Sequence, residues 1–419
     1  MSDVSSRPYS EIDISSEPFW SQSVRDRDTS FAALRSKDGL SWHPKAYGSL
    51  MDDPTDPGFW AAVRHADIQE VSKNADIYSS APNLGGVMFE NVPEDLLRET
   101  QSILTMDDPE HSRTRALVAS AFSPRQIRQI AGQVQQQAET IVDDLLEHGP
   151  GDFVELVAKR LPLWTNSEML GVPEDQRERL VNAVDDMVGY NDPEYIGDRD
   201  PFTCLLTGMS ELHGIAQDRI DARRSNPTGD LMSELIRAEI DGVGMTDDEL
   251  RSYFCLLSIA GNDTTRNTTS HGIKALTEHP EQFNHLKGNF DRAIPLATEE
   301  FLRWGTPVMT FRRTALQDTA LAGQEIKQGD KVVMFYTSGN RDESVFADSW
   351  KFDISRSPNP HISFGGGGVH TCLGQHIGRM QLKSIFGQLL ARVPNLELGE
   401  PEYVAGHFMN AVKRMPITF

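Results

Sequence analysis

Cysteine is scarce in this sequence: only Cys204, Cys255 and Cys372 occur, far apart from one another. Scattered cysteines do not form a disulfide framework, and a reducing compartment is therefore expected. Long apolar runs are missing too, so no transmembrane helix is expected. The polar, acidic N-terminus lacks the basic start and the apolar core of a secretory signal. Together these absences predict a cytoplasmic protein with no membrane span.

Basic residues are outnumbered, with 40 Lys and Arg against 62 Asp and Glu, for a net charge of −22. A surface of this sign repels phosphate backbones, so no nucleic acid partner is expected. Internal repeats and low-complexity linkers are absent as well. What the sequence does contain is 419 residues, 38% of them hydrophobic, which is enough to bury a sizeable core. Residues 1–16 are polar and are expected to form a flexible tail.

Helical patterns dominate the first half of the chain. Pro124 is expected to open a helix, with Ser123 as its N-cap. An Asp-, Gly- and Pro-rich stretch over 192–201 predicts a mobile loop. Helices are expected over residues 110–148, 175–191 and 205–224.

The second half is patterned more clearly. Thr246 and Glu249 form a capping box that should start a long helix running to about His279. Pro280 and Pro295 each stand where another helix should begin. A strand over 331–336 and a final helix over about 374–392 complete this half. Because helices dominate and strands are few and late, the sequence predicts a mainly α fold with a small β part.

The strongest chemical signal is the segment His361-Ile-Ser-Phe-Gly-Gly-Gly-Gly-Val-His-Thr-Cys-Leu-Gly. Its glycines allow left-handed backbone angles and a close approach to a flat ligand. Cys372 stands just ahead of a long amphipathic helix, where the positive end of the helix dipole and unpaired N–H groups favour thiolate over thiol. A thiolate in this position is a soft metal ligand, and haem iron is one metal that a single cysteine sulfur holds.

Other interpretations of this loop fit less well. A lone cysteine is often only a small buried hydrophobe, and that interpretation suits Cys204 and Cys255. A phosphate-binding loop would need Gly-Lys-Ser/Thr after the glycines, which does not follow here. A zinc site would need a second cysteine or a helical histidine pair nearby. The glycines and the neighbouring His370 favour a ligand role for Cys372.

A second unusual segment lies inside the long helix expected after Thr246. Apolar residues up to Ala260 are followed by Gly-Asn-Asp-Thr-Thr-Arg-Asn-Thr-Thr-Ser. Glycine and threonine weaken a helix, and threonine hydroxyls can bond back to carbonyls one turn earlier and bend it. Such a bend would place a free carbonyl, a hydroxyl and the Asp263 carboxylate in one groove, suited to dioxygen and proton delivery. Taken alone, the segment is more simply explained as a face turned to water.

These segments together resemble the cytochrome P-450 family. The family's cysteine signature has a phenylalanine, glycines, a basic residue two positions before the cysteine, and Cys-x-Gly; Phe364, His370, Cys372 and Gly374 follow this order. Phe364 lies one position farther from the cysteine than is usual, so the loop holds one extra glycine. The polar helix segment resembles the family pattern (Ala/Gly)-Gly-x-Asp-Thr-Thr.

The resemblance implies a P-450 fold formed by one catalytic domain over residues 17–419, with a haem (heme b, iron protoporphyrin IX) between the long central helix and the helix after the cysteine. Cys372 would hold the iron. Thr264 would hold dioxygen and Asp263 would relay protons, as the catalytic pair. The residues that would contact the cofactor are His111, Arg115, Ala260, Gly261, Arg313, Gly365, His370 and Gly374.

Charged residues outside this set also match the family. Glu300 and Arg303 correspond to its Glu-x-x-Arg pair, and Arg356 would be the third member, fixing the loop ahead of the cysteine. Their implied role is structural. Arg312 and Arg113 are adjacent alternatives for the basic residues that bind the haem propionates.

The implied activity is that of a bacterial monooxygenase, which inserts one oxygen atom of O2 into a C–H bond of a hydrophobic substrate. No flavin or iron–sulfur motif occurs, so ferredoxin and ferredoxin reductase are implied as electron donors. We expect a basic docking patch near the cysteine, made by Arg125, Arg128, Arg379 and Lys383.

The same motifs look most like the actinobacterial branch that oxidises methyl-branched lipids, isoprenoids and sterol side chains. The pocket would be lined by the apolar segments 84–89, 256–260, 307–310 and 408–409. Two alternatives stay open at this point. One is a haem-thiolate protein that binds or senses a ligand without oxidising it. The other is a haem-free helical interaction protein in which Cys372 is structural.

Overall fold

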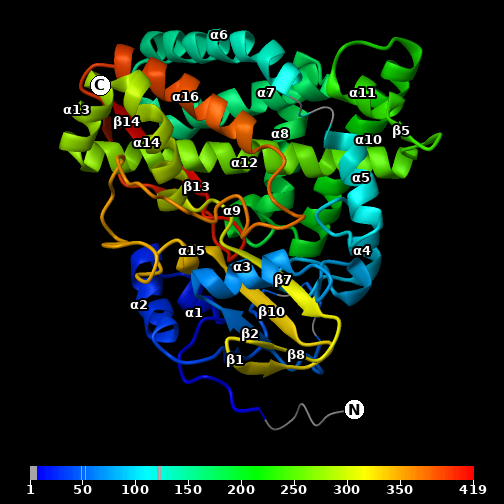
Figure 1. Ribbon diagram of the computed structural model, residues 1–419. Coiled ribbons are helices and arrows are strands. Elements are labelled where there is room, and N and C mark those ends of the chain that lie inside the picture. The colour runs from blue at the N-terminus through cyan, green and yellow to red at the C-terminus, as the bar shows by residue number, and fades with distance from the viewer. Residues whose placement is uncertain (1–6, 49, 52, 120–121, 123) are drawn as a thin grey trace.

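Helices make up most of the computed structural model, which describes residues 7–419 except 49, 52, 120, 121 and 123. Figure 1 shows a large helical part and a smaller part built around a sheet. In the described part of the chain, no helix is long and apolar enough to cross a membrane. The helices are α1 (Glu17–Trp20), α2 (Val24–Arg35), α3 (His65–Lys73), α4 (Glu94–Glu99), α5 (Glu110–Ala119), α6 (Pro124–His148), α7 (Arg160–Leu170), α8 (Glu174–Val188), α9 (Pro193–Ile196), α10 (Pro201–Ser225), α11 (Leu231–Arg237), α12 (Asp247–Glu278), α13 (Pro280–Gly288), α14 (Phe290–Gly305), α15 (Tyr336–Gly339) and α16 (Gln375–Arg392).

The main sheet has five strands in the order β1-β2-β10-β7-β3. Only the β2–β10 pairing is parallel among its four neighbouring pairs. Both faces of the sheet are covered, so four successive residues of β10 are buried. The strands are β1 (Ser41–His43), β2 (Phe59–Ala62), β3 (Tyr78–Ser79), β4 (Gly151–Asp152), β5 (Glu239–Ile240), β6 (Val243–Gly244), β7 (Thr310–Ala315), β8 (Thr319–Leu321), β9 (Gln324–Ile326), β10 (Lys331–Phe335), β11 (Glu397–Leu398), β12 (Glu402–Tyr403), β13 (Val412–Arg414) and β14 (Pro416–Thr418).

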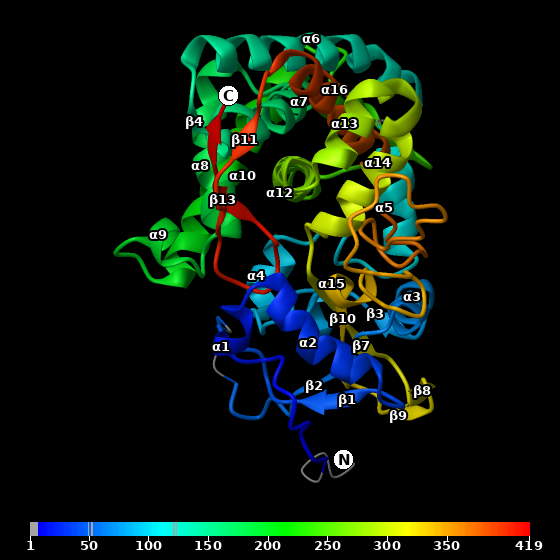
Figure 2. The ribbon, with the colours of Figure 1, turned by 90° about the vertical axis from the view of Figure 1, so that its left-hand side faces the viewer.

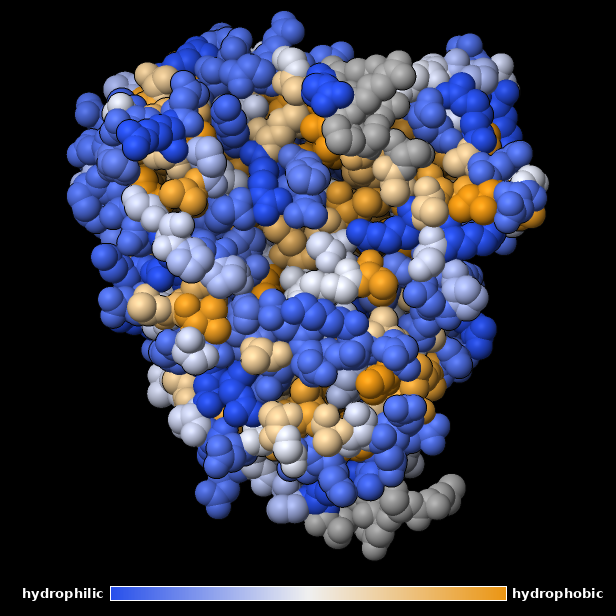
Figure 3. Space-filling view, viewed as in Figure 1, coloured by the Kyte–Doolittle hydropathy of each residue, from blue (hydrophilic) through white to orange (hydrophobic). Residues whose placement is uncertain are grey.

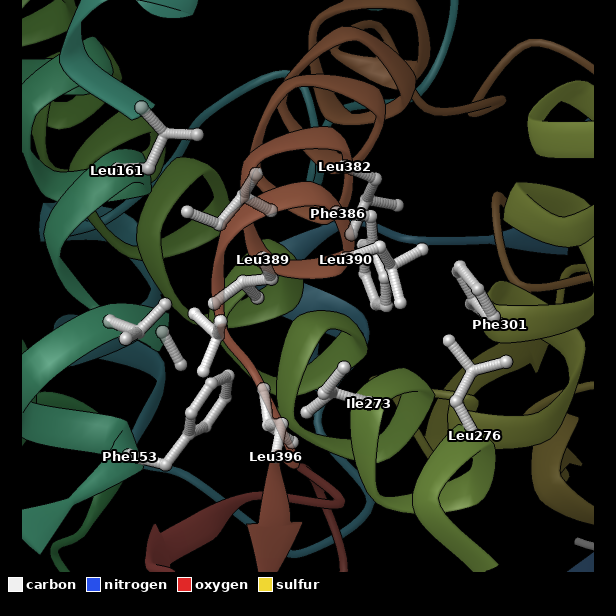
Figure 4. Close-up of a cluster of buried hydrophobic side chains, with 14 of the residues drawn as sticks. Phe153, Leu161, Ile273, Leu276, Phe301, Leu382, Phe386, Leu389, Leu390 and Leu396 are labelled. Atoms are coloured by element: carbon white, nitrogen blue, oxygen red, sulfur yellow. The ribbon is translucent and has the colours of Figure 1, made fainter. Parts of the chain in front are cut away.

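The long helix α12 runs through the middle of the helical part, where Figure 2 shows it end-on. Its N-terminus carries the expected capping box: the Thr246 hydroxyl accepts a hydrogen bond from the Glu249 N–H, and the Glu249 carboxylate accepts one from the Thr246 N–H. Ile273 and Phe301 belong to a large apolar cluster that joins α12 to α14 and α16 (Figure 4). The rings of Phe301 and Phe386 stack with centroids 4.4 Å apart. This packing fixes α16, the helix that follows the cysteine loop.

Two expected features of the chain differ in the structure. Pro295 lies inside α14 and does not begin it. The buried residues Ile294 and Ala297 lie on either side of it, so packing against the core offsets the cost of about 3 kcal/mol that an interior proline imposes. The expected mobile loop over 192–201 contains the short helix α9, whose N-cap is Asp192. Pro124 begins α6, whereas its expected N-cap Ser123 lies outside the described residues.

The N-terminal segment also differs from the expected flexible tail. Residues 7–16 lie against the rest of the protein, and Ile14 is fully buried. The Arg7 guanidinium forms an ion pair with Asp330 at 2.8 Å and lies over the ring of Trp42 at 5.0 Å. A charge that is both paired and stacked holds this segment in place. The face seen in Figure 3 is mostly hydrophilic, with apolar residues gathered in its upper middle part.

Candidate functional site

The glycine run before Cys372 folds against the end of α3. Gly365, Gly367 and Gly368 have φ angles of 96°, 99° and 77°, in the left-handed region that favours glycine. A Cβ added to Gly366 would lie 2.7 Å from the Ser72 Oγ. These glycines were expected to allow a close approach to a flat ligand, but the close neighbour of Gly366 is the protein's own helix.

Other glycines of the segment face open space. A Cβ on Gly365 would meet nothing nearer than the His370 carbonyl oxygen at 3.9 Å, and one on Gly374 would meet nothing within 4 Å. The backbone N–H of Cys372 donates to the Phe364 carbonyl at 3.0 Å, which closes the loop. Cys372 therefore stands at a fixed place directly before α16, beside glycines that leave room for a flat group.

The pKa of the Cys372 thiol is affected in opposite directions by its surroundings. Burial raises its pKa, while hydrogen bonds from the backbone N–H groups of Gly374 and Gln375 lower it. The net direction is upward, so the helix end alone does not favour thiolate, contrary to expectation. A nearby positive charge such as a metal ion is what would make the thiolate the stable form. The described residues contain no cluster of three or more His, Cys, Asp or Glu side chains that could hold a metal.

Four basic side chains converge beside the cysteine loop: His111 and Arg115 from α5, Arg313 from β7, and His370 from the loop itself. The rings of His111 and His370 have centroids 4.3 Å apart. The Arg115 Nη2 donates to the Thr371 carbonyl oxygen at 2.7 Å. The expected propionate-binding residues are therefore brought together by three different elements of the fold.

Of these four side chains, only His111 has an acid within ion-pair distance in the described part of the chain. Burial and the nearby charges of Arg313, His111 and Arg115 together lower the pKa of His370 to about 3. Both ring nitrogens of His111 are buried without a hydrogen-bond partner, and its ion-pair neighbour Asp108 is 3.8 Å away. Both histidines are therefore uncharged at neutral pH, and the positive charge of the cluster comes from Arg115 and Arg313. Buried polar groups without acceptors are costly, so the cluster fits a ligand that brings carboxylates, as the two haem propionates do.

The alternative Arg312 points elsewhere. Its Nη1 donates to the Asn91 Oδ1 at 3.0 Å, and its Nη2 donates to the Gly85 carbonyl oxygen. Successive residues of a strand point to opposite faces of the sheet, so Arg312 and its neighbour Arg313 cannot serve the same site. Arg313, the arginine preferred from the sequence pattern, is the one that lies beside His370.

The polar segment of α12 is only partly buried. Ala260 is exposed and Gly261 and Thr264 are half-buried, although the helix runs through the middle of the protein. The Thr264 hydroxyl donates to the Ala260 carbonyl at 2.9 Å. A free carbonyl was expected in this segment, but this one already accepts a hydrogen bond. The helix is continuous from Asp247 to Glu278, so the expected interruption does not break it.

Asn166 on α7 packs against α12 where Gly261 stands, which explains why this position holds a glycine. Its Nδ2 donates to the Leu257 carbonyl at 2.9 Å. A Cβ on Gly261 would lie 2.8 Å from the Asn166 Oδ1, so only glycine leaves this side chain room. The sequence pattern did not indicate Asn166, because it lies 91 residues away from its acceptor.

Asp263 is fully buried and paired. The Arg266 Nη2 lies 2.9 Å from its Oδ1, and Arg266 also lies 3.3 Å from Asp185 on α8. Burial raises the pKa of Asp263 to about 6, although the Arg266 charge lowers it. A carboxyl that titrates this close to neutrality can both accept and donate a proton under physiological conditions.

The three charged residues expected to fix the loop ahead of the cysteine, Glu300, Arg303 and Arg356, lie together. Arg303 is fully buried and forms an ion pair with Glu300 at 2.7 Å, and the Arg356 Nε lies 3.3 Å from the same carboxylate. The Arg303 Nη1 also donates to the Ser349 carbonyl at 2.8 Å. These contacts tie α14 to the chain between β10 and the cysteine loop.

Three of the expected pocket segments are joined by backbone hydrogen bonds. The Arg312 N–H donates to the Val87 carbonyl at 2.8 Å, and the Met309 N–H donates to the Phe408 carbonyl at 2.8 Å. Residues 84–89, 307–310 and 408–409 therefore lie side by side. The fourth segment, 256–260, is the part of α12 that leads to the exposed Ala260.

The profile of the cytochrome P-450 family matches residues 87–394. The chain belongs to this family. A methyl-branched lipid omega-hydroxylase of Mycobacterium tuberculosis is 36% identical over 98% of this chain and 95% of its own. A steroid C26-monooxygenase of Mycolicibacterium smegmatis is 38% identical over 93% of this chain and 89% of its own.

Solved P-450 structures share the fold. A P-450 of Mycobacterium marinum in complex with pseudoionone is 50% identical, has a TM-score of 0.95, and covers 99% of this chain and 100% of its own. A P-450 of Novosphingobium aromaticivorans is 29% identical with a TM-score of 0.83, over 94% of both chains. The family identifies the chain as a haem-thiolate P-450 monooxygenase that depends on redox partners and takes a hydrophobic substrate.

Proposed function

We propose that this P-450 holds heme b through Cys372 and hydroxylates a methyl-branched lipid, an isoprenoid or a sterol side chain. The observation that carries the proposal is the convergence of four basic side chains on the loop that holds Cys372, with the two histidine rings in contact. His111, Arg115, Arg313 and His370 would bind the propionates. Gly365, Gly374, Ala260 and Gly261 would leave room for the two faces of the ring.

The haem, when bound, supplies the activation of O2 with electrons from outside the chain. The chain's own part is proton delivery and the exclusion of water. The Thr264 hydroxyl is half-buried and now donates to the Ala260 carbonyl. If that hydrogen bond breaks, the hydroxyl can donate to an oxygen atom of O2 instead. Asp263 lies next to it in the chain, and a carboxyl with a pKa of about 6 can resupply the proton near neutral pH. Arg266 and Asp185 would fix the position of the Asp263 carboxylate.

Three relatives support the substrate class. The names of two curated relatives describe oxidation near the end of a branched lipid chain or at C26 of a steroid, and the half-identical P-450 was solved with pseudoionone. The pocket segments that lie together here are mainly apolar, which suits a ligand of this kind. A long apolar chain with a branched end is common to all three classes.

The substrate test is a titration of the purified haem protein with a methyl-branched fatty acid, an isoprenoid ketone and a sterol with an intact side chain, followed by product analysis. We expect a shift of the Soret band with at least one of them, and a product that gains one oxygen atom at the branched end. If none of the three classes shifts the spectrum, the substrate class is wrong. If ligands bind but a surrogate ferredoxin and its reductase give no product, the chain is a ligand-binding protein and not a hydroxylase.

We also propose that a ferredoxin, reduced by a ferredoxin reductase, delivers the electrons. Arg128 and Lys383 are exposed, and an acidic partner would find these cations on a protein of strongly negative charge. Arg379 adds less, because its Nε lies 2.6 Å from Glu299, which neutralises it. The side chain of Arg125 lies outside the described residues.

A further inference from the structure

Arg27 on α2 is a buried cation with almost no hydrogen bonding. The residue is 6% exposed, and its Nη1 donates only to the Met309 thioether sulfur, at 3.4 Å. Its Nε is buried without a partner. Within the described part of the chain, no carboxylate forms an ion pair with it and no oxygen accepts from it. A guanidinium has five N–H donors, and burying them unpaired is costly even with the Trp20 ring 5.0 Å away.

Other buried arginines show how unusual this is. Arg303 is paired with Glu300, and Arg35 with Asp28 at 2.7 Å. The nearest parallel is Arg313, which is also buried and donates only to the carbonyl of the residue before it. Arg313 is the arginine we assign to a propionate of the haem. Arg27 resembles Arg313 in being a buried guanidinium without a carboxylate partner in the described part of the chain.

Arg27 stands at the edge of the expected substrate pocket. Its neighbour Met309 belongs to the pocket segment 307–310 and bonds through its backbone to Phe408 of the segment 408–409. Figure 2 shows α2 next to the C-terminal loop that leads into β13. Met309 lies four residues before Arg313, which belongs to the basic cluster. The segment 307–310 therefore connects the neighbourhood of Arg27 with that cluster along the chain.

Two tyrosines flank the guanidinium and one of them reaches the surface. Burial lowers the pKa of Arg27 to about 10, and the hydroxyls of Tyr47 and Tyr403 oppose this. Arg27 therefore stays charged at neutral pH. Tyr403 is 50% exposed, which places Arg27 close to the outside of the protein. The acids Glu17 and Glu90 raise the pKa of Tyr47, and within the part of the chain that the structure describes neither forms an ion pair with Arg27.

We propose that Arg27 binds the carboxylate of the substrate, and that the preferred substrates are long branched-chain acids oxidised at the end far from that carboxylate. The inference rests on the proposed function and deepens it. With the carboxylate at Arg27, the apolar chain runs along residues 307–310 and 408–409 toward Thr264. Anchoring one end at the pocket edge directs the opposite end to the reaction centre.

The test compares a methyl-branched fatty acid with its methyl ester, which has the same chain but no charge. In the haem-loaded wild type, we expect the acid to bind about tenfold tighter than the ester by spectral titration, because a charge-assisted hydrogen bond is lost in the ester. In Arg27→Gln, the acid should lose this advantage while the Kd of the ester changes little. Arg27→Lys keeps the charge and should keep part of the preference.

Arg25→Gln is the matched control. Arg25 lies on the same helix, is exposed and stacks over Trp350 at 5.6 Å, so the variant removes the same charge without touching the pocket edge. The acid preference should survive in it. Equal affinity of wild type for acid and ester, or an unchanged preference in Arg27→Gln, would overturn the anchor and leave the hydroxylase function intact. If neither compound shifts the spectrum of a correctly loaded protein, the lipid substrate class fails and the anchor with it. If Arg27→Gln does not fold, the wild-type ratio and Arg27→Lys decide.

Discussion

Arg266 joins Asp263, three residues earlier on α12, to Asp185 on α8. Its guanidinium lies 2.9 Å from the first carboxylate and 3.3 Å from the second. All three side chains are buried or nearly so, and burial also raises the pKa of Asp185. Burial raises the pKa of Asp263 to about 6, and the nearby Asp185 carboxylate, which shares Arg266 with it, adds to this rise.

Replacing Asp263 by Asn should slow product formation about a hundredfold, because the side chain can no longer donate and accept a proton. The amide has nearly the same shape, so substrate binding and the haem spectrum should be unchanged. The measurement is the rate of product formation with a surrogate ferredoxin, together with the fraction of electrons lost to hydrogen peroxide. A variant with wild-type coupling would remove Asp263 from the proton path.

The same substitution should change the pH dependence of stability. The pKa of Asp263 is about 6 in the native protein, whereas an unfolded Asp titrates near about 3.9, so the native state holds this proton more tightly. The free energy of unfolding should therefore rise, from this group, as the pH falls from about 7 to about 4, by on the order of 2–3 kcal/mol.

Urea unfolding of wild type and Asp263→Asn at pH 4.5 and pH 7 provides the measurement. The stability of the variant relative to wild type should be greater at pH 7 than at pH 4.5. Comparing the two proteins cancels the opposite contribution of carboxyls such as Glu299, whose pKa is lowered to about 2 by Arg379 and His361 despite its burial. A pH-independent difference would show that Asp263 does not titrate in this range.

Cys372→Ser should abolish the far-red-shifted Soret band of the reduced carbon monoxide adduct and lower product formation by at least about a hundredfold, because a hydroxyl is a poor ligand at this position. Cys204→Ser is the control, since the Cys204 Sγ hydrogen bonds to Asp186 and lies in a separate apolar cluster. Retention of the spectral band and of the product in Cys372→Ser would show that this cysteine is not the ligand of the haem iron.

Glu300→Gln should lower the free energy of unfolding by about 3–5 kcal/mol, because it leaves the fully buried Arg303 without its counter-charge. The exposed pair of Glu94 and Arg98 also lies within one turn of a helix and serves as control; Glu94→Gln should cost less than about 1 kcal/mol. Both values come from denaturant unfolding. Equal small effects would mean that the buried pair is not needed for the loop ahead of the cysteine.

Charge reversal at Arg128 and Lys383 should slow reduction by ferredoxin and flatten its dependence on salt, because fewer cations are left to attract the partner. Lys287→Glu on α13, an exposed residue outside the expected patch, is the matched control. Stopped-flow reduction at low and high salt measures the effect. Rates that fall equally in all three variants would point to net charge alone and remove the patch.

Features written in short stretches of sequence were predictable. The capping box at Thr246, the order of Phe364, His370 and Cys372, and the start of α6 at Pro124 depend on neighbours a few residues apart. Local hydrogen bonding and backbone preference decide such features, so the pattern alone is enough. The same holds for the pairing within α14 of Glu300 with the residue three positions later.

Partners that come from distant elements were not predictable in this way. Asp185 lies 81 residues from Arg266, and Asn166 lies 91 residues from the carbonyl that it contacts. Such pairs depend on how helices pack, which periodicity does not encode. The prediction that Pro295 begins a helix was wrong for a related reason, because tertiary packing overrides the local preference of proline for a helix start.

The glycines beside Ser72 have one more consequence, for the recombination of related enzymes. Gly366 tolerates no Cβ because α3, nearly 300 residues earlier, occupies that space. The cysteine loop and residues 65–73 thus form a matched pair of parts from opposite ends of the chain. A chimera that takes the loop from one relative and α3 from another will keep a well-formed cysteine site only if both come from the same parent.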